Sequence, residues 1–298
     1  MNILISGASG FIGSALKPYL ESKGHQVYLL HRGKSSGSFY WLHEQDIIHL
    51  DESITIDAVI NLNGVNIGEK SWNKKRKQAL IDSRVKSTQL LSQALVKRFE
   101  PPKVLINASA IGYYGDTRHT ETDESSKAGN NFLTDIVKQW EAAALPAVNA
   151  NIRTVFIRSG IVLANHGGAL QKMLPAFKFG LGGKIGNGQQ YMSWISLTDE
   201  LRAIAFLLDE PSIQGPVNLT APHPVTNRIF SQTLAAELRR PCLLPLPSTM
   251  IKLLFGEMGE LLLLGSNRVL PSILTRHGFQ FQHKTLAEAL NFELKASG

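Results

Sequence analysis

The stretch Gly7-Ala8-Ser9-Gly10-Phe11-Ile12-Gly13 decides the fold of this chain. It follows a short apolar run at residues 2–6 and precedes a helical pattern that extends to about residue 23. Gly24 then provides a C-cap for that helix. A glycine triplet between a strand and a helix predicts a dinucleotide-binding βαβ unit.

Each glycine of the triplet has a distinct physical role in such a unit. Gly7 permits the tight turn, Gly10 lets the backbone approach a pyrophosphate, and Gly13 lets the helix pack close to the sheet. The helix N-terminus offers free N–H groups and a positive dipole to the phosphates. The cofactor contacts predicted on this turn are Gly7, Gly10, Phe11, Ile12 and Gly13.

The end of the second strand indicates which dinucleotide is bound. An NAD site usually has Asp or Glu here for the ribose 2′-hydroxyl, but this chain has His31-Arg32. A guanidinium suits bidentate pairing with a 2′-phosphate, so the sequence favours NADP(H) over NAD(H), with His31 and Arg32 as cofactor residues. The alternative is that Arg32 is a surface residue at the start of the loop 33–38.

Strands and helices alternate along the rest of the first two thirds of the chain. Such alternation predicts an α/β fold, a Rossmann-type doubly wound parallel sheet with right-handed crossovers. The predicted strands after the first are residues 26–30, 47–50, 58–62, 104–108, 153–157 and 217–219, and the long predicted helices are residues 74–99 and 131–144.

From about residue 227 the pattern changes to short helices separated by prolines. Candidate helices are residues 230–238, 249–255 and 286–292. The sequence thus predicts an NADP(H)-binding domain over residues 1–226 and a small helical section over residues 227–298.

Composition narrows the classes of function. Hydrophobic residues make up 43% of the chain, which is ordinary for a globular protein, and no apolar run could span a bilayer. The single cysteine, Cys242, permits no internal disulfide, and the N-terminus lacks a signal peptide, so a cytoplasmic protein is expected. The histidines show no metal-binding spacing. The net charge of +7 comes without a nucleic-acid motif, so we expect no nucleic-acid partner, and the lack of a spanning run predicts no membrane partner.

Several further motifs resemble the short-chain dehydrogenase/reductase superfamily in its extended, epimerase-like form. They include Asn61-Leu62-Asn63-Gly64, Ser109 before Tyr113-Tyr114-Gly115-Asp116, and Arg158-Ser159-Gly160. More narrowly, the chain resembles an atypical branch of epimerase family proteins with an uncharacterised C-terminal domain. Motifs of that branch are Asn66-Ile67-Gly68-Glu69-Lys70, Gly167-Gly168-Ala169-Leu170, Met192-Ser193-Trp194-Ile195 and the glycine-rich residues 181–188. The resemblance implies further cofactor contacts at Leu62, Asn63, Gly64, Arg84 and Ile161.

The superfamily's proton-transfer pair is missing. Its Tyr and Lys lie four residues apart on a helix, and a Glu often follows the Lys by four. Anchoring on Glu141 places the Lys position at Val137 and the Tyr position at Leu133. A shifted register would give Thr134 and Lys138, but threonine is too weak an acid. Ser109 and Tyr113 therefore remain as the candidate catalytic residues.

Arg84 lies on the apolar face of the long helix at residues 74–99, where the superfamily has an asparagine. A charge on that face needs a partner. One interpretation is an internal ion pair with Asp82 or Asp57, and the other is contact with the cofactor.

A substrate site is expected at the carboxyl edge of the sheet. The loop at residues 66–72 should lie over this edge, with Glu69 and Lys70 either as a candidate acid or base or as exposed charges. Met192 and Trp194 either line an apolar wall or fill the core. The predicted substrate residues are Asn66, Glu69, Trp72, Met192 and Trp194.

Two kinds of function fit these observations. The first is an NADP(H)-dependent oxidoreductase or epimerase acting on a small polar substrate, with sugar nucleotides among the candidates. The second is a non-catalytic NADP(H)-binding sensor, which the missing Tyr/Lys pair supports. The resemblance also implies a homodimer formed through the helices at residues 74–99 and 131–144.

Overall fold

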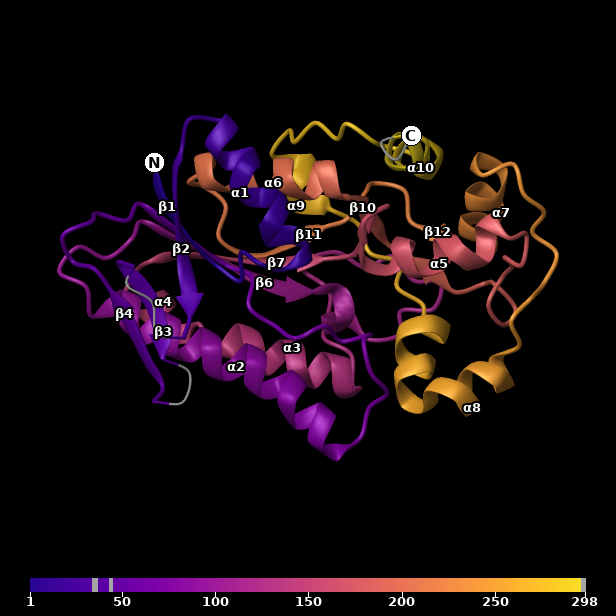
Figure 1. Ribbon diagram of the computed structural model, residues 1–298, viewed down its shortest axis with the longest axis horizontal. Helices are drawn as coiled ribbons and strands as arrows, with labels where there is room; N and C mark the ends of the chain where they lie inside the picture. The colour runs from indigo at the N-terminus through magenta and orange to yellow at the C-terminus, as the bar shows by residue number, and fades with distance from the viewer. Residues whose placement is uncertain (34–36, 43–44, 296–298) are drawn as a thin grey trace.

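The centre of the computed structural model is one eight-stranded sheet with helices on both faces (Figure 1). The structure describes residues 1–33, 37–42 and 45–295. The strand order is β11-β7-β6-β5-β1-β2-β3-β4, and neighbours run parallel except for the edge pair β3 and β4. The strands are β1 (Asn2–Ser6), β2 (Gln26–Arg32), β3 (Phe39–Leu42), β4 (Ile47–Leu50), β5 (Ala58–Asn61), β6 (Val104–Ala110), β7 (Arg153–Ser159) and β11 (Gly215–Leu219).

The predicted Rossmann-type α/β fold is confirmed. The chain passes from β1 to β2 on one side and returns to β5 on the other, so the direction of winding reverses at β1. In open α/β sheets ligands bind in the crevice outside the carboxyl ends of the strands at such a reversal. The sheet topology therefore places the glycine-rich turn at the ligand-binding edge.

The two faces of the sheet carry different helices (Figure 1). Leu16 and Leu20 of α1 join Ile204 and Leu207 of α6 in one apolar cluster on the sheet. Leu91 and Leu95 of α2 join α4 in a second cluster. The first layer contains α1 (Phe11–Ser22), α6 (Leu197–Asp209) and α9 (Ser272–Arg276), and the second contains α2 (Lys74–Val96), α3 (Phe132–Ala142) and α4 (Leu145–Asn149).

A third apolar cluster lies beyond the carboxyl edge of the sheet and joins distant parts of the chain. Trp194 and Phe230 are fully buried in it beside Leu290. None of the described helices is long and apolar enough to cross a bilayer. The elements of this region are β8 (Ile161–Ala164), α5 (Gly168–Lys178), β9 (Tyr191–Met192), β10 (Trp194–Ser196), β12 (Val225–Thr226), α7 (Asn227–Glu237), α8 (Ser248–Gly259), the one-turn segment η2 (Glu260–Leu264) and α10 (Leu286–Lys295).

Some elements differ from the sequence-based expectations. β3 was not predicted, and β4 pairs antiparallel to it at the edge of the sheet. The helix predicted at residues 131–144 is confirmed as α3, and the short α4 that follows it, with Pro146 in its first turn, was not predicted. The helices α5 and α6 were also missed. The division of the chain at residues 226 and 227 stays a prediction, since α7 and α10 pack with α5 and β8.

Replacing Gly13 by alanine tests the packing of α1 on the turn. A Cβ there would lie 2.4 Å from the Gly7 carbonyl oxygen and 2.7 Å from the Ala8 Cα, so the backbone must move. We expect Gly13→Ala to lower the free energy of unfolding by about 1–3 kcal/mol, measured by urea denaturation. Gly68→Ala is the control, because its nearest contact would be 3.8 Å away. Equal stability of the two variants would contradict the role given to Gly13.

Candidate functional site

The glycine-rich turn is held against the end of β5 by backbone contact. Gly7 has a φ of +81°, and a Cβ there would lie 2.7 Å from the carbonyl carbon of Leu62. The Gly10 N–H donates to the Gly7 carbonyl at 3.0 Å, which closes the turn. The turn therefore requires glycine at its first position for two independent reasons, dihedral angle and contact.

The N-terminus of α1 opens at this turn. Gly10 is the N-cap and has no side chain to satisfy the N–H groups of the first turn. Phe11 turns toward α5, because its ring fills the space where a Cβ on Gly167 would come within 2.2 Å. The backbone of Phe11, Ile12 and Gly13 thus presents donors to an anion, while the Phe11 ring packs on the start of α5.

His31 and Arg32 are exposed at the carboxyl end of β2. The guanidinium of Arg32 lies over the Trp41 ring, 5.8 Å from its centroid, and the Gly33 N–H donates to the Trp41 carbonyl at 2.8 Å. Among the described ion pairs none involves Arg32. Residues 34–36 of the predicted loop 33–38 lie outside the described residues.

A buried amide cluster supports the end of β5. Asn61 is fully buried and donates to Thr88 at 2.8 Å and to Asn107 at 2.7 Å. Asn63 donates from its side chain to the Ser6 hydroxyl at 2.5 Å. These bonds fix the Leu62-Asn63-Gly64 backbone beside the glycine-rich turn. The cofactor contacts predicted for these three residues require this fixed position.

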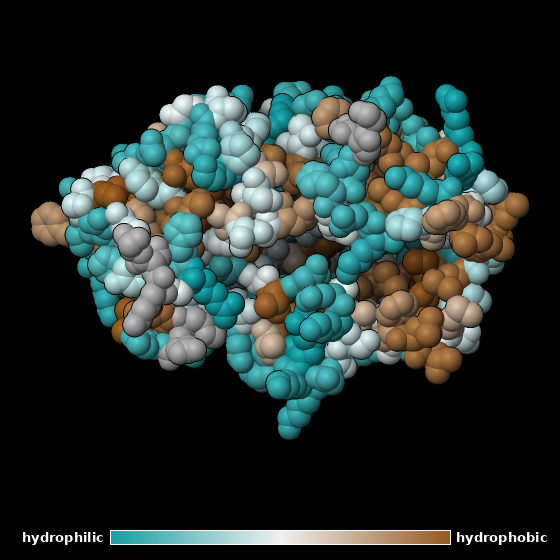
Figure 2. Space-filling model, in the orientation of Figure 1, coloured by the Kyte–Doolittle hydropathy of each residue, from teal (hydrophilic) through white to brown (hydrophobic). Residues whose placement is uncertain are grey.

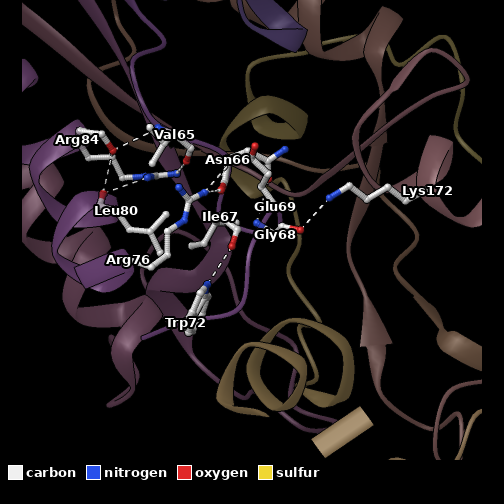
Figure 3. Close-up of polar contacts among 11 residues, drawn as sticks. Val65, Asn66, Ile67, Gly68, Glu69, Trp72, Arg76, Leu80, Arg84 and Lys172 are labelled. Atoms are coloured by element: carbon white, nitrogen blue, oxygen red, sulfur yellow. Dashed lines mark hydrogen bonds and ion pairs between the residues drawn. The ribbon is translucent and has the colours of Figure 1, made fainter. Parts of the chain in front are cut away.

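The segment after β5 forms a strap, residues 65–68, whose four carbonyls are all held by side-chain donors (Figure 3). Arg84 and Arg76 of α2 donate to the Val65 and Asn66 carbonyls at 3.1 and 2.6 Å. Trp72 donates to Ile67 at 2.9 Å, and Lys172 of α5 donates to Gly68 at 2.8 Å. The strap therefore joins α2 to α5 across the carboxyl edge of the sheet.

Arg84 does not pair with a carboxylate among the described residues. It donates instead to the carbonyls of Leu80 and Val65, and its guanidinium lies 5.1 Å from the Trp140 ring centroid. Asp82 instead accepts from Gln78, and Asp57 accepts from the Asn2 N–H, so the predicted internal ion pair is wrong. Burial lowers the pKa of Arg84 to about 10, and the charge of Arg76 adds to that effect.

The predicted substrate residues of the loop brace the strap. Glu69 pairs with Arg76 at 3.1 Å, and the Asn66 side chain accepts the Gly68 N–H at 2.9 Å. Trp72 packs edge-on against Phe132 at 5.0 Å between centroids, in addition to its bond to Ile67. Their contacts in this structure are with the protein, and a role toward substrate stays a prediction.

The candidate catalytic residues surround a buried ion pair that the sequence did not reveal. Glu141 accepts from the Arg158 guanidinium at 2.8 and 2.9 Å, and from the Ser109 hydroxyl at 2.7 Å. Arg158 also lies 3.5 Å from the centroid of the Tyr113 ring and donates to the Tyr114 hydroxyl at 3.1 Å. The ion pair therefore orients both predicted catalytic side chains.

Burial and charge act in opposite directions within this ion-pair network. Burial alone disfavours the charge on Arg158, but the hydrogen bonds and charge of Glu141 outweigh it and raise the pKa of Arg158. Burial raises the pKa of Tyr114 to about 12, although the charge of Arg158 opposes that rise. Tyr114 thus stays neutral and donates to Asn218 at 2.8 Å, which leaves it unsuited to proton transfer near neutral pH.

A cavity of about 620 Å³ lies between η1 (Ile111–Tyr114), the start of α3 and the segment from α8 to residue 267. Leu133 of α3 lines this cavity, whereas Val137, one helical turn further along, is buried beneath Gly112. Ser109 and Tyr113 are not among its lining residues. The polar and charged side chains that line it include Asp116, Arg118, His119, Asn131, Gln189, Lys252 and Glu260.

Three remaining predicted residues lie in or beside the third apolar cluster. Trp194 is fully buried, and its indole N–H donates to the His223 carbonyl at 3.2 Å, so the structure favours the core alternative for it. The Met192 sulfur accepts from Asn227 at 3.4 Å. Ile161 pairs with β10 and is half-buried, so the substrate role of Met192 and the cofactor role of Ile161 stay predictions.

Glu200 is a buried acid that sequence analysis missed. It is fully buried on α6 and accepts the Ser159 hydroxyl at 2.6 Å, at the carboxyl end of β7. Its second carboxylate oxygen has no partner among the described residues. Burial raises the pKa of Glu200 to about 8, and the bond from Ser159 opposes the rise.

Comparison with known proteins finds similarity over the whole chain. Residues 3–219 match the NAD-dependent epimerase/dehydratase family, and residues 246–292 match a domain of unknown function. An epimerase family protein of Mycobacterium leprae is 44% identical over 97% of this chain and 94% of its own length. The crystal structure of the human epimerase family protein SDR39U1 with NADPH has a TM-score of 0.92 at 35% identity, covering 99% of each chain.

A second solved structure is similar at lower identity. The protein, described as a nucleoside-diphosphate sugar epimerase from Corynebacterium glutamicum, has a TM-score of 0.79 at 27% identity. The match covers 98% of this chain and 59% of that chain.

Glu200 predicts a specific pH dependence of stability. Its folded pKa of about 8 exceeds the value of 4.5 for an ordinary glutamate, so the folded protein binds this proton more tightly than the unfolded chain. The free energy of unfolding should therefore fall as the pH rises from about 4.5 to about 8. Glu200→Gln should flatten this slope in urea denaturation, whereas the exposed control Glu121→Gln should not. An unchanged slope in Glu200→Gln would contradict the assignment.

Proposed function

Because the chain belongs to the NAD-dependent epimerase/dehydratase family, we propose that it binds NADP(H) at the carboxyl edge of its sheet and acts as an oxidoreductase or epimerase on a small polar substrate. The observation that carries the cofactor assignment is Arg32, exposed at the end of β2 on the Trp41 ring. The human relative crystallised with NADPH supports the same assignment.

The residues present fit a dinucleotide phosphate. Gly7 and Gly13 allow the turn to pack against the end of β5 and the start of α1, because a Cβ at either position would overlap backbone. The N-cap Gly10 has no side chain, so the N–H groups of the first helical turn are left for the phosphates. Arg32 has a planar guanidinium without a carboxylate partner among the described residues, which suits a 2′-phosphate. The strap at residues 65–68 closes the same edge and fixes the wall beside the cofactor.

A bound nicotinamide would supply hydride transfer, and the chain's own residues would bind the substrate, orient it and transfer a proton to it. Arg118, His119 and Gln189 line the cavity, and their side chains make no hydrogen bond or ion pair with the described residues. These donors suit a polar or anionic substrate. The similarity to a protein described as a nucleoside-diphosphate sugar epimerase supports keeping sugar nucleotides among the candidates.

The proton-transfer step distinguishes this chain from the pattern of its superfamily. With Leu133 and Val137 at the Tyr and Lys positions of the superfamily's pair, we keep Tyr113 as the proposed general acid. Ser109 is the residue proposed to hydrogen-bond the substrate. The Arg158 guanidinium lies 3.5 Å from the Tyr113 ring centroid and so positions the tyrosine, and Ser109 is oriented by Glu141.

The second candidate function is a non-catalytic NADP(H) sensor. Two observations favour it: the aliphatic Leu133 on the cavity wall, and the Ser109 hydroxyl already bonded to Glu141 rather than free for substrate. In such a protein, binding of the cofactor beside the strap would change the surface that a partner contacts.

We also propose a homodimer through α2 and α3 and a cytoplasmic location. The dimer rests on family architecture, and exposed positions of the two helices such as Gln78, Asp82 and Lys138 make the shared face polar. The location rests on Cys242, a lone cysteine that suits a reducing compartment.

Charge reversal at Arg32 tests the cofactor. Arg32→Glu should weaken NADPH binding by about 10²-fold or more, because a bidentate partner of the 2′-phosphate is replaced by a like charge. Binding of NADH should change far less, as measured by nucleotide fluorescence titration. Arg240→Glu is the control, because Arg240 is an exposed arginine that follows α7, far from the glycine-rich turn in the sequence. Equal losses of NADPH and NADH would contradict the 2′-phosphate assignment.

Turnover tests the choice between enzyme and sensor. We expect NADPH oxidation with at least one member of a panel of carbonyl compounds and sugar nucleotides. Tyr113→Phe should lower kcat by about 10²-fold or more with little change in NADPH affinity, whereas Tyr114→Phe should mainly lower stability. Turnover that survives both Tyr113→Phe and Ser109→Ala would refute the catalytic assignment. Tight NADPH binding with no turnover on the whole panel would favour the sensor.

A further inference from the structure

One end of the molecule exposes large apolar side chains that no part of the described chain covers (Figure 2). We define this docking face as residues 178–184 and 239–254, which include the end of α5 and most of α8. Phe179 is 81% exposed, Leu243 76% and Leu253 85%. Contiguous exposed apolar surface of this kind marks an interaction site. The further exposed apolar residues of the face are Leu181, Leu244, Met250 and Leu254.

The two segments of the docking face lie side by side. A Cβ on Gly180 would contact the Pro241 ring at 3.3 Å, and one on Gly183 would overlap the Leu244 carbonyl. The Leu246 N–H donates to the Lys184 carbonyl at 2.9 Å. Backbone contacts therefore hold the exposed side chains of both segments on one surface, at the end of the molecule where α7 and α8 lie (Figure 1).

The charge of the docking face has one sign. The two segments contain five Lys and Arg residues and no Asp or Glu. Lys252 pairs with Glu260 from the neighbouring η2, but Lys178, Arg239 and Arg240 are exposed and make no ion pair with the described carboxylates. The docking face therefore combines exposed apolar side chains with neighbouring cations.

The combination of exposed apolar side chains and unpaired cations indicates which kind of partner covers the docking face. A second copy docked on the same face would set arginines against arginines, since an isologous contact pairs the patch with itself. An anionic bilayer satisfies both features, because leucine and phenylalanine enter the boundary between headgroups and acyl chains while Lys and Arg bind the headgroups. We propose that the docking face binds the surface of a membrane rich in anionic lipid.

This inference replaces the sequence-based expectation of no membrane partner, which rested on the lack of a spanning segment. Peripheral docking needs no spanning segment: it requires exposed apolar side chains flanked by cations, and these become visible only once burial is known. The proposal is independent of the proposed function, since it uses no cofactor residue.

Vesicle co-sedimentation of the full-length protein tests the proposal. The protein should pellet with vesicles of phosphatidylcholine and phosphatidylserine, and much less with phosphatidylcholine alone. High salt should weaken the binding, because the headgroup contacts are screened. Arg239→Gln with Arg240→Gln should weaken binding on the order of thirtyfold. Leu243→Ser with Leu253→Ser should weaken it by roughly tenfold or more.

Matched controls lie away from the docking face. Phe99→Ser removes a side chain that is 92% exposed, and Lys97→Gln with Lys103→Gln removes two exposed cations near it. These variants should bind vesicles as the parent protein does, and all variants should keep the parent's thermal unfolding midpoint. No binding to anionic vesicles, or equal loss in the controls, would overturn the proposal. Concentration-dependent self-association that Leu243→Ser with Leu253→Ser abolishes would also overturn it, and would assign the face to a contact between copies.

Discussion

The closeness of three pieces of backbone at the carboxyl edge of the sheet is the constraint on which the rest of the site depends. Gly7 contacts the Leu62 carbonyl, and Gly13 of α1 contacts the Gly7 carbonyl, with no space for a Cβ at either position. This contact sets β1, β5 and the N-terminus of α1 at one point. The amide cluster of Asn61 and Asn63 then fixes the chain that leaves β5, and the strap starts from there.

A buried ion pair positions the candidate catalytic residues. Glu141 of α3 and Arg158 of β7 join a helix to a strand, and they hold Ser109, Tyr113 and Tyr114 from one side. Burying two charges is costly unless the geometry is good and the remaining polar groups are satisfied. Here Glu141 accepts three hydrogen bonds, so the requirement is met. The same Arg158 guanidinium lies 3.5 Å from the Tyr113 ring centroid and donates to the Tyr114 hydroxyl, so one cation positions both tyrosines.

The sequence predicted the fold well where local signals were strong. The glycine triplet, the apolar strands and the caps located the first βαβ unit with β1 correct at both ends. α6 had a usable signal that was overlooked, since Ser196 caps it and Asp199 and Glu200 follow in the first turn. α5 was harder, because it begins at Gly168 and contains Pro175, both poor helix residues.

The site was less predictable, because its partners are distant in sequence. Arg158 stands out in the sequence only as part of a motif, and nothing local shows that a strand residue pairs with a helix residue 17 positions earlier. Arg84 was recognised as a buried charge, but its partners are carbonyls of its own helix and the strap, and carbonyls carry no sequence signal. The exposure of the docking face likewise depends on which residues fail to find a cover in three dimensions.

α8 contributes residues both to the cavity and to the docking face. Ser248 and Lys252 line the cavity, while Leu253 and Leu254 face outward on the docking face. The helix is tied to the Rossmann domain by Lys77 and Glu257 at 2.5 Å, and η2 brings Leu262 within 3.8 Å of a Cβ on Gly68 in the strap. The same helix therefore contributes side chains to the cavity and to the docking face. Coupling between a bound membrane and a bound substrate requires only that the two favour the same position of this helix, and by linkage it must act equally in both directions.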